Sequence, residues 1–256
     1  MRLKLNLSCR QGAMLPLNNR YELSAIVYKI LSKANPEFAE WLHDKGYTAD
    51  GRNFKLFTFG HLATFPYDRV GQNIVTRSGQ IEFQISFMVE EMISNFVAGL
   101  FQDQHFGLGN ADLRPVDMRI ENVEILPNPT FTETMRYTCH TPILLSEQVG
   151  NNKHKTYISP LDEGYEDLFL HNLIGKVIAA DRNIGVPEAS FRLLSPPQYV
   201  QSKPVWIHKP SLKKPIMLRP FAFDFELTAP VDWHEVGYMA GFGAESSMGL
   251  GFCEVI

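Results

Sequence analysis

Three side chains near the start of the chain, Tyr28, His43 and Lys55, are of types that can catalyse proton transfer at a phosphate ester. Histidine titrates near neutral pH and serves as a general base or a general acid. Lysine supplies positive charge to an anionic transition state, and tyrosine can orient a hydroxyl group or assist proton transfer. Together they suit metal-free cleavage of RNA, in which the 2′-hydroxyl group loses a proton and the departing 5′-oxygen gains one.

Tyr28 lies on an amphipathic helix that we predict for residues 22–33. The apolar side chains recur with helical spacing and form one stripe, which consists of Leu23, Ile26, Val27, Ile30 and Leu31. Because each residue turns a helix by about 100°, Tyr28 lies about 140° from Leu23 on the helical wheel. We therefore expect its phenol at the edge of the buried stripe, where it can reach across the domain surface.

His43 lies in the last turn of a second, shorter helix that we predict for residues 35–46. Asn35 can cap this helix, Pro36 fits its first position and Gly46 ends it. Its buried face is predicted to hold Phe38, Trp41 and Leu42. The partial negative charge at a helix C-terminus favours an imidazolium, which would suit a general acid.

Lys55 opens a strand predicted for residues 54–62, so one helix–helix–strand unit carries all three residue types. Each of the three also has a simpler interpretation. A histidine at a helix end is often a solvated cap, and Tyr28 can be an aromatic residue at the edge of the core. Lys45 or Arg52 can fill the electrostatic role of Lys55.

Neither the cysteines nor the histidines have the spacing of a metal site, so we expect no metal and no cofactor. The cysteines lie far apart in the sequence and indicate reduced core thiols: Cys9, Cys139 and Cys253. We interpret the remaining histidines as surface or core groups: His61, His105, His140, His154, His171, His208 and His234.

The composition is that of an ordinary globular protein, with 256 residues of which 45% are hydrophobic and 20% charged. No apolar run approaches the roughly 20 residues of a membrane span, and residues 2–10 alternate as a strand does rather than as a signal peptide does. We therefore expect a cytoplasmic protein without a membrane partner. The net charge of −4 argues against a strongly basic nucleic-acid binder, so any such role must rest on a local patch.

The first half of the chain follows the order β-α-β-β-α-β of the ferredoxin-like unit. Alternating apolar residues predict strands at 2–10, 54–62, 79–89 and 115–126. The two helices described above and a third, predicted for 89–101, connect them.

The second half repeats this scheme after a segment with two prolines and no periodicity. The predicted strands and helices are strands 136–146, 189–194, 221–229 and 249–256, and helices 164–180 and 232–242. The sequence thus predicts an α+β protein with two tandem ferredoxin-like (RRM-like) βαββαβ domains, at 1–126 and 130–256.

One stretch of the second half, residues 201–220, is basic and carries no acidic residue. Its cations are Lys203, Lys209, Lys213, Lys214 and Arg219. Trp206 and His208 lie among them and could stack on bases. The stretch predicts either an RNA-binding patch or simply a solvated hairpin.

The stretch GFGAESSMGLGF at 241–252 contains two Gly-apolar-Gly units. A dinucleotide-binding loop follows a strand and opens a helix, whereas here a helix precedes and a strand follows. One alternative is a helix cap and a tight turn, with Gly241 or Gly243 as the left-handed residue and with Gly249 and Gly251 as packing positions in the strand. The other alternative is a ligand-binding loop.

The form of this terminal stretch resembles the glycine-rich loop of the repeat-associated mysterious proteins, which are RNA-binding proteins of CRISPR systems. With its tandem fold and its N-terminal segment LPLNNRYELSAIVYKILSKANPEFAEWLHDKG…FKLFTF, the whole chain looks like the CRISPR-associated endoribonuclease that cuts repeat-containing precursor transcripts into guide RNAs. The resemblance implies that Tyr28, His43 and Lys55 are catalytic and that the partner is CRISPR repeat RNA. It implies products with a 2′,3′-cyclic phosphate and a 5′-hydroxyl group.

The resemblance also implies that residues 201–220 form a hairpin near the RNA, with the glycine-rich loop beside it. Backbone N–H groups of the loop would then approach the RNA or the partner domain. The RNA-binding residues predicted in this way are Lys203, Trp206, His208, Lys209, Lys213, Lys214, Arg219, Gly241, Gly243, Gly249 and Gly251.

Further partners stay open: a multi-subunit CRISPR interference complex, and a second copy of the chain in a homodimer. Two other functions also stay open. One is a non-catalytic guide-RNA-binding subunit, because some members of the family have lost the histidine and still bind RNA. The other is a two-domain metabolic enzyme or sensor that binds a small phosphorylated ligand at the glycine-rich loop.

Overall fold

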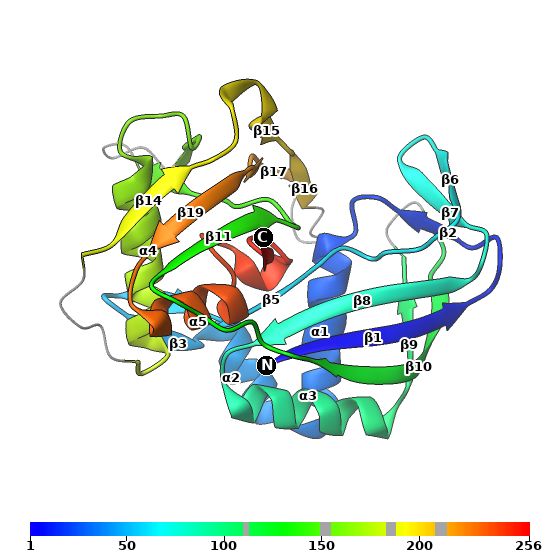
Figure 1. Cartoon of the computed structure of the whole chain (residues 1–256). Helices are drawn as coiled ribbons and strands as arrows, with labels where there is room; N and C mark the ends of the chain where they lie inside the picture. The colour runs from blue at the N-terminus through cyan, green and yellow to red at the C-terminus, as the bar shows by residue number, and fades with distance from the viewer. Residues whose placement is uncertain (110–112, 149–154, 183–187, 208–213) are drawn as a thin grey trace.

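The computed structural model describes residues 1–109, 113–148, 155–182, 188–207 and 214–256. The first half of the chain builds a five-stranded antiparallel sheet in the order β5-β8-β1-β10-β9 (Figure 1). Its strands are β1 (Arg2–Cys9), β5 (Phe57–Phe59), β8 (Gln80–Phe87), β9 (His105–Leu108) and β10 (Val116–Leu126). The central strand β1 pairs with β8 on one side and β10 on the other, and its leucines Leu3, Leu5 and Leu7 are buried.

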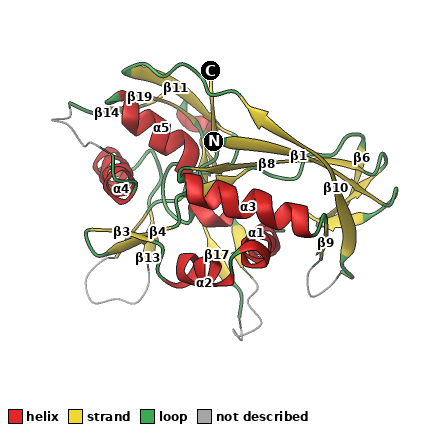
Figure 2. Ribbon diagram, turned by 90° about the horizontal axis from the view of Figure 1, so that it is seen from below, coloured by secondary structure: helices red, strands yellow, loops and turns green. Residues whose placement is uncertain are grey.

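Three helices cover one side of this sheet, as Figure 2 shows: α1 (Arg20–Ala34), α2 (Pro36–Asp44) and α3 (Glu90–Gln102). The predicted stripe of α1 is buried except for Ile26, which is half-buried. Gly99 of α3 lets the two helices approach, since a Cβ there would lie 2.0 Å from the carbonyl oxygen of Ile30. Asn35 caps α2 as expected, because its side chain accepts a hydrogen bond from the amide of Phe38.

The buried face of α2 differs from the prediction at one position. Phe38 and Leu42 are buried, but Trp41 is 38% exposed and Ala39 takes the buried place. The indole packs edge-on against Tyr47, with ring centroids 5.1 Å apart. Spacing alone could not separate these positions, because Trp41 lies at the border of the face that α2 turns to the core.

The second half builds a four-stranded sheet in the order β14-β19-β11-β20. Its strands are β11 (Thr134–Cys139), β14 (Ser190–Leu193), β19 (Asp224–Thr228) and β20 (Cys253–Val255), and its helices are α4 (Tyr165–Ala179) and α5 (Val231–Ala240). When the four main strands of each half are numbered in chain order, their order across the sheet is second, third, first, fourth in both halves. This is the ferredoxin-like arrangement, and the α+β prediction with two such units is confirmed. The division between 1–126 and 130–256 falls between β10 and β11 and stays a prediction.

Several predicted strands are shorter than expected. The strand at 54–62 is two strands, β4 (Arg52–Phe54) and β5, because Leu56 adopts a left-handed conformation with φ of 51° and breaks the ladder. The strand at 136–146 ends at Cys139, and that at 249–256 begins only at Cys253. The remaining short strands form small sheets of two or three strands: β2 (Met14–Pro16), β3 (Tyr47–Ala49), β6 (Tyr67–Val70), β7 (Asn73–Thr76), β12 (Ser146–Gln148), β13 (Lys155–Tyr157), β15 (Gln201–Ser202), β16 (Val205–Ile207), β17 (Ile216–Leu218) and β18 (Phe221–Ala222).

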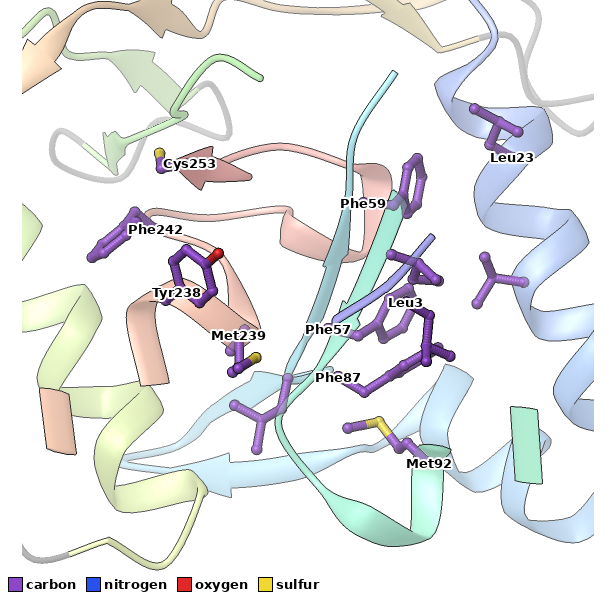
Figure 3. Close-up of a cluster of buried hydrophobic side chains, with 14 of the residues drawn as sticks. Leu3, Leu23, Phe57, Phe59, Phe87, Met92, Tyr238, Met239, Phe242 and Cys253 are labelled. Atoms are coloured by element: carbon purple, nitrogen blue, oxygen red, sulfur yellow. The ribbon is translucent and has the colours of Figure 1, made fainter. Parts of the chain in front are cut away.

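The two halves share one apolar core, in which side chains of α5 lie beside those of β5 and β8 (Figure 3). Arg2 is buried at the junction and fastens the halves together. Its guanidinium donates to the carbonyl oxygens of Tyr238 at 2.8 Å and Cys253 at 2.6 Å. It also lies 3.3 Å from the centroid of the Tyr238 ring, a cation–π contact. Buried polar contacts of this kind fix the halves in one orientation.

The cysteines are unpaired, as expected, but only Cys253 is fully buried, while Cys9 and Cys139 are half-buried. Among the described residues, no helix is both long enough and apolar enough to cross a membrane.

Candidate active site

The side chains of Tyr28, His43 and Lys55 converge from α1, from α2 and from the link between β4 and β5. The rings of Tyr28 and His43 meet edge to face with centroids 5.1 Å apart. The Lys55 ammonium donates a hydrogen bond of 2.7 Å to the backbone carbonyl oxygen of His43. A phenol, an imidazole and an ammonium group therefore share one small surface.

The left-handed turn at Leu56 explains the position of Lys55. It separates Lys55, whose ammonium reaches α2, from Phe57, which is fully buried under Tyr28. The ammonium satisfies a carbonyl group that the end of α2 leaves without an intrahelical partner. Burial lowers the pKa of Lys55, although the carboxylates of Asp44 and Glu245 oppose the shift.

Tyr28 is half-buried, and its environment keeps the phenol protonated. Burial raises the pKa of Tyr28 well above its ordinary value; hydrogen bonding with the Ser247 side chain opposes the rise and the charge of Glu245 adds to it. Ser247 and Glu245 come from the glycine-rich stretch, whose short 3₁₀ helix η2 (Ser246–Met248) packs against α1 and β5.

His43 is the most accessible of the three, with 67% of its side chain exposed. Its Nδ1 lies 2.8 Å from the carboxylate of Asp44, the next residue. Because a carboxylate only accepts hydrogen bonds, this contact places a proton on Nδ1 and leaves Nε2 as the nitrogen that can exchange a proton with a ligand.

Sequence reasoning missed Asp44, Glu245 and Ser247. Asp44 was missed because it is adjacent to His43 in sequence, and helix geometry does not predict contact between adjacent side chains. Glu245 and Ser247 lie between the two Gly-apolar-Gly units, and the presence of polar side chains in that loop was a signal that could have indicated them.

The four glycines of the stretch are buried within the protein, and each adopts a positive φ. Gly249 ends η2 in the left-handed conformation, and a Cβ there would lie 2.3 Å from the ring of Phe59. At Gly251 a Cβ would lie 1.8 Å from the carbonyl oxygen of Phe242. The prediction that Gly249 and Gly251 belong to the final strand is therefore wrong, and Gly241 caps α5 without being left-handed, since its ψ is 146°.

The glycine-rich loop was expected to approach either the RNA or the partner domain. In the structure it packs closely against the N-terminal half of the chain. The Arg20 guanidinium donates to the carbonyl oxygen of Gly249, and the Thr58 hydroxyl donates to that of Leu250 at 2.9 Å. From the C-terminal half, the buried Lys176 ammonium donates to the carbonyl oxygens of Ala240, at 3.3 Å, and Gly241. Contact between RNA and the glycines themselves stays a prediction, but the exposed part of the turn is centred on Glu245.

The basic stretch contains the hairpin β16–β17, which lies beside the glycine-rich loop. Its inner side chains, Val205, Ile207 and Leu218, form a small apolar cluster with Leu144 and Leu250. Lys203, Trp206, Lys214 and Arg219 are exposed. His208, Lys209 and Lys213 were predicted to bind RNA and lie outside the described residues. The hairpin thus packs on the glycine-rich loop, and its strand β16 also contacts α1.

Comparison with known proteins gives one family. The family model for the C-terminal part of the CRISPR-associated protein Cas6 matches residues 126–255, and one for a Cas6 N-terminal part matches 14–118. A CRISPR-associated endoribonuclease Cas6 of Methanocaldococcus jannaschii is 28% identical, over 98% of this chain and 91% of its own length.

Two solved structures have the same fold. One, described as CRISPR associated protein Cas6, has a TM-score of 0.78 and 26% identity, and the match covers 100% of this chain and 99% of that one. Another, described as a RAMP protein binding different RNA substrates, has a TM-score of 0.80 over 100% and 99% of the two chains, but at 17% identity it shows the fold alone. Because a single family model spans half of the sequence, this chain belongs to the Cas6 family of CRISPR-associated proteins.

Proposed function

We propose that this chain is an endoribonuclease that cuts CRISPR repeat RNA in precursor transcripts to make guide RNAs, without a metal ion. The 2′-hydroxyl group would attack the adjacent phosphorus and leave a 2′,3′-cyclic phosphate and a 5′-hydroxyl group. The observation that carries this proposal is the convergence of Tyr28, His43 and Lys55 at the edge of the glycine-rich loop. The endoribonuclease activity named for the Methanocaldococcus relative supports it.

In this proposal Tyr28 acts as a hydrogen-bond donor rather than as a base. Its raised pKa keeps the phenol neutral at physiological pH, so the hydroxyl group can orient the 2′-hydroxyl or a phosphoryl oxygen. The buried ring is held by Phe57 and by His43, which leaves only the polar end available.

His43 exchanges the proton and Lys55 neutralises charge. Nε2 of His43 faces away from the contact with Asp44 and can take a proton from the 2′-hydroxyl group or give one to the 5′-oxygen. The Lys55 ammonium, anchored to the backbone of the same helix, adds positive charge close to the phosphoryl oxygens. Both roles follow from side chains of this chain alone.

The RNA partner would extend from this site across the exposed cations of the basic stretch, among them Lys203 and Arg219. Such contacts contribute affinity without sequence selection. Hand-over of the product to a multi-subunit CRISPR interference complex, action as a homodimer, and a cytoplasmic location are further parts of the proposal.

The test is cleavage of the repeat RNA from the CRISPR array that accompanies this protein, in the presence of EDTA. We expect cutting by the wild type, no cutting of RNA with a 2′-deoxy substitution at the attacking position, and a loss of about 10²- to 10⁴-fold in rate for His43→Ala. The matched control is His105→Ala, because His105 is also an exposed histidine next to a carboxylate, with Nδ1 3.5 Å from Asp117. Its rate should equal that of the wild type.

A requirement for Mg²⁺ would contradict the proposed chemistry, as would equal rates for His43→Ala and the wild type. Equal binding of the RNA by both proteins, with no cutting by either, would instead favour a guide-RNA-binding subunit.

A further inference from the structure

A cleft of about 440 Å³ adjoins the candidate active site and is lined by both halves of the chain. Lys55 and Ser247 belong to both the cleft and the site. Helix α4 contributes Leu168, Asn172 and Lys176, which are spaced by four residues and so lie on one helical face. The volume lies in the usual range for one small ligand, so it suits a single nucleotide.

The charge of this cleft favours a ligand with a phosphate group. Its described lining carries four basic side chains, Arg52, Lys55, Lys155 and Lys176, and one carboxylate, Glu245. The rest of the chain has a net negative charge, so this is a local concentration of positive charge. Clefts lined by one sign of charge attract ligands of the opposite sign.

Asn172 gives the cleft an unused capacity for recognition. Its side chain is only 8% exposed, and its Oδ1 has no hydrogen-bond partner in the described part of the chain. Leaving a buried acceptor without a partner is unfavourable, and such a group in a native protein calls for an explanation. A carboxamide combines an acceptor with donors, and it can therefore match the paired donor and acceptor on the edge of a nucleobase.

Two neighbouring lysines are already hydrogen-bonded to backbone carbonyl groups. The Lys176 ammonium, one turn further along α4, is committed to the carbonyl oxygens of Ala240 and Gly241. Lys55 is bound to the carbonyl oxygen of His43. These cations contribute charge, whereas Asn172 contributes a directional and unfilled hydrogen-bonding group.

We propose that this cleft receives the base of one unpaired nucleotide next to the scissile phosphate, and that Asn172 selects that base. The inference rests on the proposed function, since the site at the border of the cleft is the one that would cut. It adds a specificity-determining residue from the C-terminal half to a site whose three reacting groups all come from the N-terminal half.

The test is a double-mutant cycle between the protein and the RNA, measured as binding so that it does not depend on cleavage. The RNA is the repeat with a 2′-deoxy substitution at the attacking position, either intact or with one base removed to leave an abasic ribose, at each position in turn. For the wild type, one abasic position should weaken binding at least about tenfold. Asn172→Leu should bind the intact RNA that much more weakly, and the same abasic position should cause no further loss.

Two controls separate recognition from folding. Asn172→Leu keeps the size of the side chain and removes an unpartnered polar group, so its melting temperature should equal or exceed that of the wild type. Asn128→Leu changes the same residue type at an exposed position outside the lining of the cleft, and it should retain the full abasic effect.

The proposal is overturned if the abasic effect is equally large in the wild type and in Asn172→Leu, or if no position shows one. It is also overturned if Asn172→Leu melts lower and loses affinity for every RNA alike. Failure of the proposed function gives a different result. If His43→Ala cuts as fast as the wild type but the abasic effect is still lost in Asn172→Leu, the catalytic assignment is rejected and base recognition in the cleft stands.

Discussion

The glycine-rich loop at 241–252 and the hairpin β16–β17 lie side by side, but the protein holds them differently. Polar side chains from both halves hold the loop at its ends, with the half-buried Arg20 bound to Gly249 and the buried Lys176 bound to Gly241. The hairpin is attached mainly through one apolar face, on which Val205, Ile207 and Leu218 are nearly buried. Its other face carries exposed Trp206, 45% accessible.

This difference matches two kinds of contact with an RNA. A group that influences a proton at a reacting atom must be held within a fraction of an ångström, and Ser247 and Glu245 beside Tyr28 are on the rigid loop. Cations that neutralise phosphates along a strand tolerate looser positions, because charge attraction is not directional. Substitutions that disturb packing should therefore have their largest effect in the loop. Substitutions that remove charge should act mainly through RNA affinity in the hairpin region.

The largest effect is expected for Gly251→Ala. The new Cβ would lie 1.8 Å from the carbonyl oxygen of Phe242, in a residue with φ of 71°. Backbone atoms cannot move aside cheaply, so overpacking adds to the cost of the left-handed conformation, and we expect a loss of about 3 kcal/mol or more in the free energy of unfolding. Chemical denaturation measures this loss.

Gly12→Ala isolates the conformational part of that cost. Gly12 has a similar φ of 76°, but no atom of the described residues lies within 4 Å of the position of its Cβ. Its loss should be about 1 to 2 kcal/mol. If both variants lose the same amount, the loop is not tightly packed against the rest of the protein, and the contrast with the hairpin fails.

The fold was predictable from the sequence where periodicity was strong, and the glycine-rich loop shows where it was not. The buried stripe of α1 and the alternation of Ile81, Phe83 and Ile85 in β8 are local signals, so those elements are in the predicted places. The role of Gly251 depends on Phe242, and that of Gly249 on Phe59, which is distant in sequence. Contacts of that kind leave no periodic pattern.

A second, smaller effect concerns Lys176 and pH. Burial lowers the pKa of its ammonium from 10.5 to about 7 in the folded protein. Between these values the unfolded chain binds a proton that the folded chain has lost, so this residue makes the free energy of unfolding rise with pH in that window. Below about pH 7 both states are protonated and its contribution no longer changes.

Lys176→Met should remove that rise. The stability difference between the variant and the wild type should change by on the order of 2 kcal/mol between pH 7 and pH 9, in favour of the wild type at the higher pH. Lys29→Met, at an exposed position on α1, is the control and should leave the slope unchanged. A slope that survives in Lys176→Met would show that another group causes the rise and that burial does not lower the pKa of Lys176.

The candidate site was predictable only in part for a related reason. The residue types and helix positions of Tyr28 and His43 indicated one shared surface, and the structure brings them together with Lys55. The supporting groups Ser247 and Glu245 are brought there by the packing of η2 on α1. Asn172 was not predicted at all, because its significance is an acceptor without a partner among the described residues, in a cleft formed by two halves of the chain.

The smallest effect is expected in the hairpin region, for Lys203→Ala. Lys203 is exposed, so its loss should leave stability and the cleavage rate at saturating RNA unchanged. If its ammonium contacts one phosphate of a single strand, the slope of log affinity against log salt should fall by about 0.7. Lys4→Ala is the matched control, because Lys4 is already neutralised by Glu124 at 2.9 Å on the first sheet and its slope should match the wild type. An unchanged slope for Lys203→Ala, or a loss of cleavage at saturation, would mean that this segment is not a charge contact and that its contrast with the rigid loop must be abandoned.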